Sequence, residues 1–146
     1  MDSKIVGQFR DVLRIFEREL DFQNNSGCCC GVTLSQCHAL MELSKEDNLS
    51  LNLLSEKLSV DKSAVSRTIE NLVNKDLVVR KIPKENRRVT NLKLTKMGID
   101  VCNQINTGNN GYYVKALSSI PDDDLAIFLR SFENMVAHMS KLNKGQ

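Results

Sequence analysis

With 146 residues, 41% of them hydrophobic and 26% charged, the chain has the size and composition of one soluble domain, residues 1–146, and is long enough for one core and a dimer interface. Its first twenty residues mix charged and apolar side chains at helical spacing, which argues against a signal peptide or a membrane span. We therefore expect a cytoplasmic protein without a membrane partner. The net charge of +2 hides a basic block, because residues 57–96 hold eleven Lys or Arg against four Asp or Glu. Such a block suggests a phosphate-facing surface, although on charge alone a solvated charged face is the more common explanation.

Two helices are predicted before residue 45. Apolar side chains recur every three or four positions over residues 3–23, which predicts an amphipathic helix. After a loop over residues 24–31, Thr33 and Gln36 have the spacing of a capping box, so Thr33 should open a second helix that ends near Ser44. The side chains that we expect this second helix to bury are Leu34, Cys37, Leu40 and Met41.

A pair of short helices and a hairpin are predicted next. Ser50 can cap a third helix, residues 59–60 form a tight turn, and Asp61 can cap a fourth helix. The fourth helix should bury Val65, Ile69, Leu72 and Val73. Two β-rich runs follow at residues 77–82 and 89–94, joined by a polar loop with a basic tip, which is typical of a hairpin.

The C-terminal part of the chain predicts further helices. Thr95 can cap a fifth helix that begins at Lys96, and the Gly- and Asn-rich residues 106–111 indicate a kink or break in it. The last helix should begin after Pro121, where three aspartates complement its positive end. The predicted fold is therefore mainly α-helical with a small β-hairpin wing.

The third and fourth helices with the hairpin have the chemistry of a DNA-reading unit at residues 50–95. Small polar side chains let a helix approach base edges, and an arginine can donate two hydrogen bonds to a guanine. An arginine on the hairpin could reach the minor groove or phosphates. The candidate DNA contacts are Lys62, Ser63, Ser66, Arg67, Arg87 and Arg88.

Several motifs of this unit resemble the MarR (multiple antibiotic resistance regulator) family. They are residues 58–67 (Leu-Ser-Val-Asp-Lys-Ser-Ala-Val-Ser-Arg), residues 72–78 (Leu-Val-Asn-Lys-Asp-Leu-Val), and the run from Arg87 through Leu92 and Leu94-Thr95 to Gly98. The resemblance implies a winged helix-turn-helix regulator of double-stranded DNA, usually a repressor, whose affinity is set by a small effector. It also implies a homodimer, in which helices from residues 1–25 and 96–146 form the dimerisation region.

Two positions depart from the family pattern. Asn86 stands where the family usually has an Asp that would anchor the wing arginine, so the rigidity of the wing is open. Asp76 stands where a Gly usually precedes the hairpin, and an Asp can adopt the left-handed conformation at a cost of about 1 kcal/mol. Neither departure removes the predicted DNA-binding face.

A cysteine-rich segment lies just before the DNA-reading unit. A cytoplasmic protein should keep its cysteines reduced, so no disulfide framework is expected. Thiolates from the loop and the second helix could bind a thiophilic metal or metalloid ion, or could sense oxidants. Cys37 alone is more simply explained as a small core residue. The candidate effector residues are Cys28, Cys29, Cys30, Cys37 and His38.

Two other functions compete with DNA-binding regulation. A thiol-based redox enzyme would use the cysteines, but the sequence has neither a Cys-x-x-Cys motif near a βαβ pattern nor a plausible base and orienting partner. A winged-helix module that binds protein is the other alternative. It would have no need of the basic hairpin, so the charge pattern favours DNA.

Overall fold

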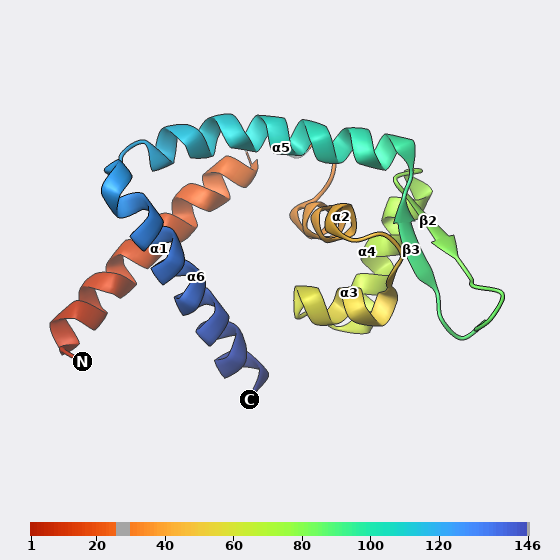
Figure 1. Ribbon diagram of the computed structural model, residues 1–146, viewed down its shortest axis with the longest axis horizontal. Helices are drawn as coiled ribbons and strands as arrows, with labels where there is room; N and C mark the ends of the chain where they lie inside the picture. Colours follow the sequence, from red (N-terminus) through yellow and green to blue (C-terminus); the bar gives the residue numbers. More distant parts are fainter. Residues whose placement is uncertain (26–29, 146) are drawn as a thin grey trace. The chain divides into compact units, whose positions relative to one another are not determined.

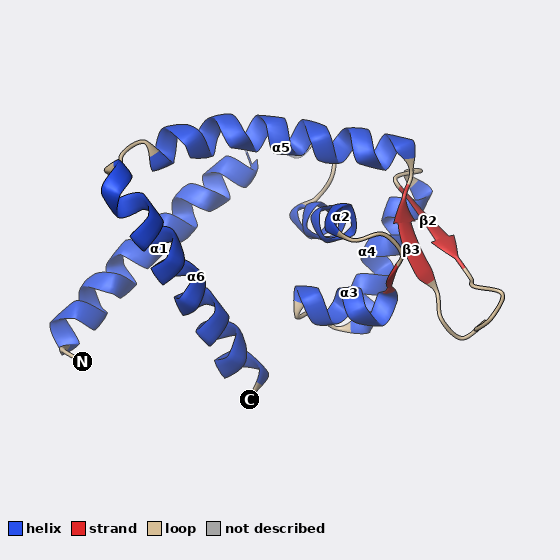
Figure 2. Cartoon of the chain, viewed as in Figure 1, coloured by secondary structure: helices blue, strands red, loops and turns tan. Residues whose placement is uncertain are grey.

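The computed structural model describes residues 1–25 and 30–145. These residues form six helices and three short strands, and two compact units, Met1–Gly108 and Asn109–Gln146 (Figures 1 and 2). The elements in chain order are α1 (Ser3–Asn25), α2 (Leu34–Lys45), β1 (Leu49–Ser50), α3 (Leu51–Leu58), α4 (Lys62–Asn74), β2 (Val78–Lys81), β3 (Asn91–Leu94), α5 (Lys96–Leu117) and α6 (Asp122–Lys144).

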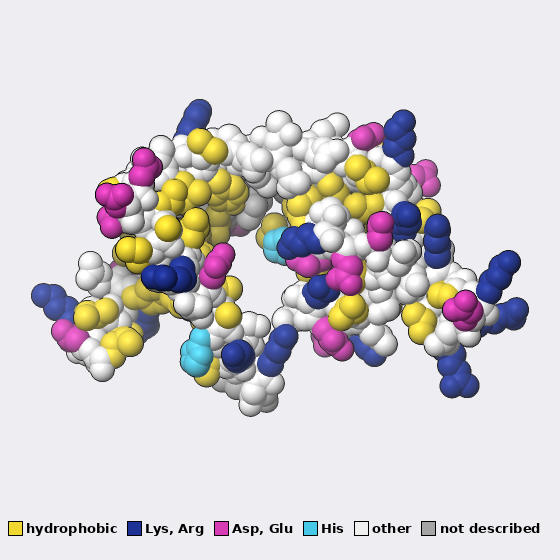
Figure 3. Space-filling model, viewed as in Figure 1, with side chains coloured by type: hydrophobic (Ala, Val, Ile, Leu, Met, Phe, Trp, Pro, Cys, Tyr) yellow, Lys and Arg dark blue, Asp and Glu magenta, His cyan; other side chains and the backbone are white. Residues whose placement is uncertain are grey.

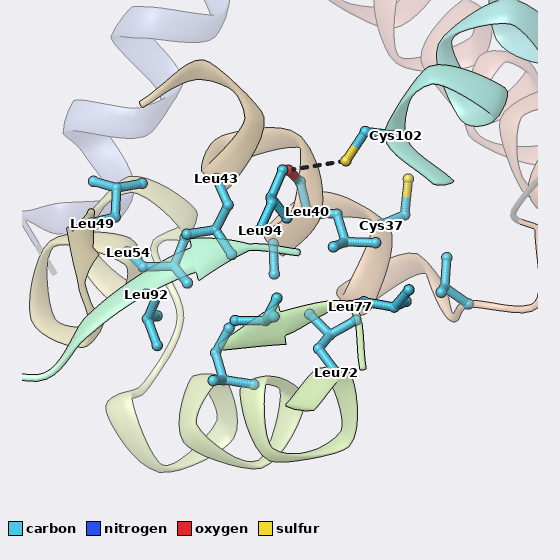
Figure 4. Packing of buried hydrophobic residues seen from close by; sticks show 14 of the residues in the cluster. Cys37, Leu40, Leu43, Leu49, Leu54, Leu72, Leu77, Leu92, Leu94 and Cys102 are labelled. Atoms are coloured by element: carbon cyan, nitrogen blue, oxygen red, sulfur yellow. Dashed lines mark hydrogen bonds between the residues drawn. The ribbon is translucent and has the colours of Figure 1, made fainter. Parts of the chain in front are cut away.

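The first unit carries the core, which is built by α2, α3 and α4 against the sheet (Figure 4). The three antiparallel strands have the order β1-β3-β2, with Val78 opposite Leu94 and Leu49 opposite Leu92. The predicted hairpin is thus confirmed, and β1 is an addition that the sequence analysis did not predict. Side chains with less than 2% exposure fill the centre: Leu40, Leu49, Leu54, Val65, Ile69, Leu72, Val78, Leu92 and Ile105.

The predicted helix starts are formed by local hydrogen bonds. Gln36 N–H donates to the Thr33 hydroxyl at 3.3 Å, and Thr33 N–H donates to the Gln36 side chain at 3.2 Å, which is the expected capping box. The Ser50 hydroxyl accepts from Leu53 N–H at 3.1 Å, as its capping role requires. Asp61 occupies the N-cap of α4, but its side chain makes no capping hydrogen bond. The side chains of Thr33 and Ser50 therefore cap their helices as predicted, whereas the side chain of Asp61 does not.

Two expectations about helices were wrong. Leu34 is 43% exposed rather than buried, because it is the first residue of α2 and precedes the face that packs on the core. The helix α5 runs unbroken through Gly108 and Gly111, neither of which has a positive φ. Each glycine lowers helix stability by about 1 kcal/mol but can adopt helical dihedral angles. The helix therefore continues across both glycines.

The helices α1 and α6 bury no side chain within the described chain, although both are amphipathic as predicted. Val12 and Ile15 on α1 are 59% and 50% exposed, and Ile127 and Val136 on α6 are 55% and 48% exposed. Within residues 1–25 and 30–145, no helix is long and apolar enough to cross a membrane.

Candidate nucleic-acid interface

The helix α4 presents a polar face opposite its core-packing face. Val65, Ile69 and Leu72 are buried at 2% exposure or less, which anchors one side of the helix. Lys62, Ser63 and Arg67 are exposed, and Ser66 is partly buried. Within residues 1–25 and 30–145, neither Lys62 nor Arg67 forms an ion pair, so both cations are available to a ligand.

The end of α4 is closed by a Schellman motif at Asp76. This residue has φ +57°, the left-handed conformation expected from its place in the sequence. Asp76 N–H donates to the carbonyl of Val73 at 2.9 Å, and Leu77 N–H donates to the carbonyl of Leu72 at 3.0 Å. Leu72 and Leu77 are both buried, which adds the apolar contact typical of this motif. The chain therefore turns sharply from α4 into β2.

A junction centred on Thr95 joins the end of α4 to the start of α5. The Thr95 hydroxyl donates to the carbonyl of Asp76 at 2.6 Å and accepts from Gly98 N–H at 2.9 Å. Thr95 N–H donates to the carbonyl of Leu77 at 3.1 Å. A Cβ on Gly98 would lie 2.1 Å from that same carbonyl oxygen, so only glycine fits there. Thr95 and Gly98, which belong to the motifs that resemble the MarR family, therefore hold α4, β2 and α5 together.

The wing is the loop between β2 and β3, residues 82–90. The Asn86 side chain accepts from Arg88 N–H at 3.1 Å, and Val89 N–H donates to the carbonyl of Asn86 at 3.2 Å. Asn86 thus closes the turn at the wing tip through the backbone rather than through an ion pair. Arg87 and Arg88 are exposed, and basic side chains project around the β2–β3 loop at the right of Figure 3. The four ion pairs of the described part of the chain involve neither arginine.

The proposed effector residues lie in different environments. Cys28 and Cys29 fall outside the described residues. Cys30 is exposed, Cys37 is buried in the core at 7% exposure, and His38 is exposed. Among the residues that the structure describes, no group of three or more His, Cys, Asp or Glu could hold a metal ion. The burial of Cys37 agrees with its interpretation as a core residue.

Cys102 is a second buried thiol of the core. It is 3% exposed and donates a weak hydrogen bond to the carbonyl of Leu40, with a sulfur–oxygen distance of 3.6 Å (Figure 4). Burial raises the pKa of this thiol, and a hydrogen bond from the backbone N–H of Cys102 itself lowers it by less. Cys102 is therefore a protonated core residue, which is unsuited to fast reaction with oxidants.

Sequence reasoning missed one contact at the end of α4. The ammonium group of Lys75 donates to the carbonyl of Gly31 at 2.8 Å and to the Gln36 side chain at 3.1 Å. These partners are 44 and 39 residues away in the chain. No local pattern indicates such a pairing, since Lys75 looks like an ordinary exposed lysine after a helix.

These elements define the class of the protein. Two short helices joined by a tight turn, with an exposed polar second helix and a two-stranded basic wing, form a winged helix-turn-helix. Residues 32–90 match the model of the MarR family. This segment, 59 of the 146 residues, is therefore similar to the MarR family of winged-helix transcriptional regulators.

A curated relative and solved structures are also similar to this chain. Over 95 residues, 65% of its length, the chain is 28% identical to the HTH-type transcriptional repressor MdtR of Bacillus subtilis (strain 168), and it spans 61% of that protein. A MarR family protein from Bacillus stearothermophilus is similar with a TM-score of 0.82 at 20% identity, over 96% of this chain and 99% of that one. Streptococcus pneumoniae FabT gives a TM-score of 0.79 at 18% identity, over 97% and 99% of the two chains. At these identities, the two structures show a shared fold.

Proposed function

We propose that the chain is a dimeric, sequence-specific DNA-binding regulator of transcription in the cytoplasm, and that it acts as a repressor. The observation that carries the proposal is the pairing of an exposed Ser- and Arg-bearing face on α4 with a basic wing held to the same junction. The FabT structure that shares this fold is a complex with DNA, and the relative MdtR is named a repressor, both of which support the proposal.

In this proposal, α4 enters the major groove by its N-terminal half. Ser63 and Ser66 are small enough to let the helix backbone approach the base edges, and Arg67 donates two hydrogen bonds to a guanine. Lys62, at the start of the helix, contacts a phosphate. The wing residues Arg87 and Arg88 reach the minor groove or the phosphates beside it.

The dimer in this proposal is formed by α1 and α6. Both helices expose apolar side chains along their length and bury none within the described chain, and exposed apolar faces of this kind mark surfaces that bind a partner. A symmetric dimer would present two copies of α4 to successive major grooves, about 34 Å apart. The operator should therefore contain two inverted half-sites.

The cysteine-rich segment is the proposed effector site. Binding of a thiophilic metal or metalloid ion, or oxidation, at Cys28, Cys29 and Cys30 would change the start of α2 and with it the spacing of the two α4 helices. The exposure of Cys30 supports this role, whereas the burial of Cys37 favours a structural one. Serine replacement of Cys28, Cys29, Cys30 and Cys37 should abolish any response of DNA affinity to metals and oxidants. An unchanged response would exclude the segment as a sensor.

Selection from a random pool of DNA duplexes tests the central function. The purified protein should enrich one palindromic site, and the Arg67→Ala protein should bind that site with lower discrimination at one base pair of each half. A protein that enriches no sequence, and whose binding to DNA does not depend on salt, would favour the protein-binding alternative.

A further inference from the structure

The side chain of Lys75 is held in place by two acceptors, which is unusual for a lysine at the surface. Lys75 is the C-cap residue that follows α4, and its ammonium group lies 2.8 Å from the carbonyl oxygen of Gly31 and 3.1 Å from Oε1 of Gln36. A lysine that is free in water retains about 2 kcal/mol of rotamer entropy, so two charge-assisted hydrogen bonds are needed to offset its ordering. The contact joins the end of α4 to the residues that precede α2.

Both acceptors are themselves constrained. Gln36 is 6% exposed, and its Oε1 also accepts from Thr33 N–H at 3.2 Å, so this oxygen is shared between the capping box and Lys75. Gly31 has φ +79°, a conformation that glycine adopts without strain and that other residues adopt only at a cost. Lys75 therefore responds to the backbone conformation of Gly31 and to the start of α2.

We propose that Lys75 is a positioning residue, which fixes α4 against residues 31–36 and transmits changes in that segment to the DNA-reading helix. The inference rests on the proposed DNA-binding function and names a route for its regulation. Lys75 makes no base or phosphate contact in this proposal. Its effect on DNA passes through the orientation of α4.

The length of α4 makes its orientation sensitive to this contact. The helix has 13 residues and is about 20 Å long at 1.5 Å per residue. A tilt of about 5° at the Lys75 end moves the other end, next to Lys62, by roughly 1.7 Å. Hydrogen bonds to base edges tolerate only about 0.5 Å of displacement, so such a tilt weakens sequence reading more than it weakens attraction to phosphates.

A double-mutant cycle in DNA affinity tests the route. Gly31→Ala changes the backbone alone, because no atom lies within 4 Å of the added Cβ while φ is unfavourable for alanine. Lys75→Met keeps the aliphatic side chain and removes the donor. Each substitution should weaken binding to the selected duplex by roughly five-fold, and the double variant should be no weaker than Lys75→Met alone. Lys75→Arg should retain the affinity, and Lys45→Met should leave it unchanged, because Lys45 lies on α2 and forms its ion pair with Glu42 of the same helix.

Random duplex DNA separates positioning from direct contact. The Lys75→Met protein should bind random DNA with the wild-type salt dependence. A slope that falls by about 0.9, with equal loss on both duplexes, would identify Lys75 as a phosphate contact and overturn the proposal. Losses from Gly31→Ala and Lys75→Met that multiply in the double variant would overturn it as well.

Thermal unfolding in the absence of DNA tests the contact of Lys75 with Gln36 separately from the proposed DNA binding. Gln36→Glu preserves the capping box and adds a charge opposite Lys75, so it should raise the melting temperature of the wild-type protein and raise it less in the Lys75→Met protein. An equal gain in both backgrounds would refute the contact. A wild-type protein that enriches no duplex would instead overturn the proposed function, and the transmission to DNA with it.

Discussion

Gly98→Ala should destabilise the protein strongly, although alanine is the better helix former. The new Cβ would lie 2.1 Å from the carbonyl oxygen of Leu77 and 3.3 Å from Cδ2 of Leu94. An ordinary contact needs at least about 3.4 Å, so the backbone must move by more than 1 Å and strain the hydrogen bond from Thr95 N–H to Leu77. Overpacking of this kind costs about 3 kcal/mol, whereas the better helix propensity of alanine contributes about 1 kcal/mol. We expect a net loss of about 2 kcal/mol.

The same helix supplies the control for this substitution. A Cβ on Gly108 or Gly111 meets no atom within 4 Å, so Gly108→Ala and Gly111→Ala should each stabilise the protein by up to about 1 kcal/mol. Urea unfolding at one fixed protein concentration measures all three, since the stability of the proposed dimer would depend on concentration. A Gly98→Ala protein as stable as the Gly108→Ala protein would refute the close approach of α5 to Leu77.

Three further predictions follow from the same geometry. Asp76→Gly should raise the free energy of unfolding by about 1 kcal/mol in urea titrations by relieving the left-handed strain, and Asp76→Ala should give no gain. Arg67→Ala should cost about 1–3 kcal/mol on the selected duplex and relax one base preference, whereas Arg88→Ala should lower affinity for all duplexes and reduce the salt slope by about 0.9; equal behaviour of the two variants would contradict the assigned roles. Because burial raises the pKa of Cys102, the unfolded chain loses this proton first, so its stabilising effect is full below pH about 8.5 and declines above it. Unfolding titrations of Cys102→Ala should show less of this alkaline decline, and an equal decline in both proteins would show that the thiol is not responsible.

Features set by short-range chemistry were predictable from the sequence. The capping box of Thr33 and Gln36, the cap at Ser50 and the left-handed Asp76 are each set by residues within a few positions, and the structure confirms them. The apolar spacing of α4 likewise predicted Val65, Ile69 and Leu72 as buried. The DNA contacts of the candidate side chains remain predictions, and the structure leaves most of these side chains exposed.

Features set by distant partners were not predictable. The strand β1 has two residues and exists because Leu49 and Ser50 pair with β3, about 40 positions later. The hydrogen bonds of Lys75 have no local pattern, and the uninterrupted α5 contradicts the local preferences of Gly108 and Gly111. In each case, the tertiary context decides what short-range propensity leaves open.

Binding of random duplex DNA at two salt concentrations tests the central claim most directly. If the basic face of residues 57–96 contacts phosphates, the logarithm of the association constant should fall linearly with the logarithm of salt concentration, by about 0.9 for each phosphate neutralised. Several contacts per protomer predict a steep slope. An affinity that does not change with salt, or no binding at low salt, would contradict the assignment of α4 and the wing to DNA.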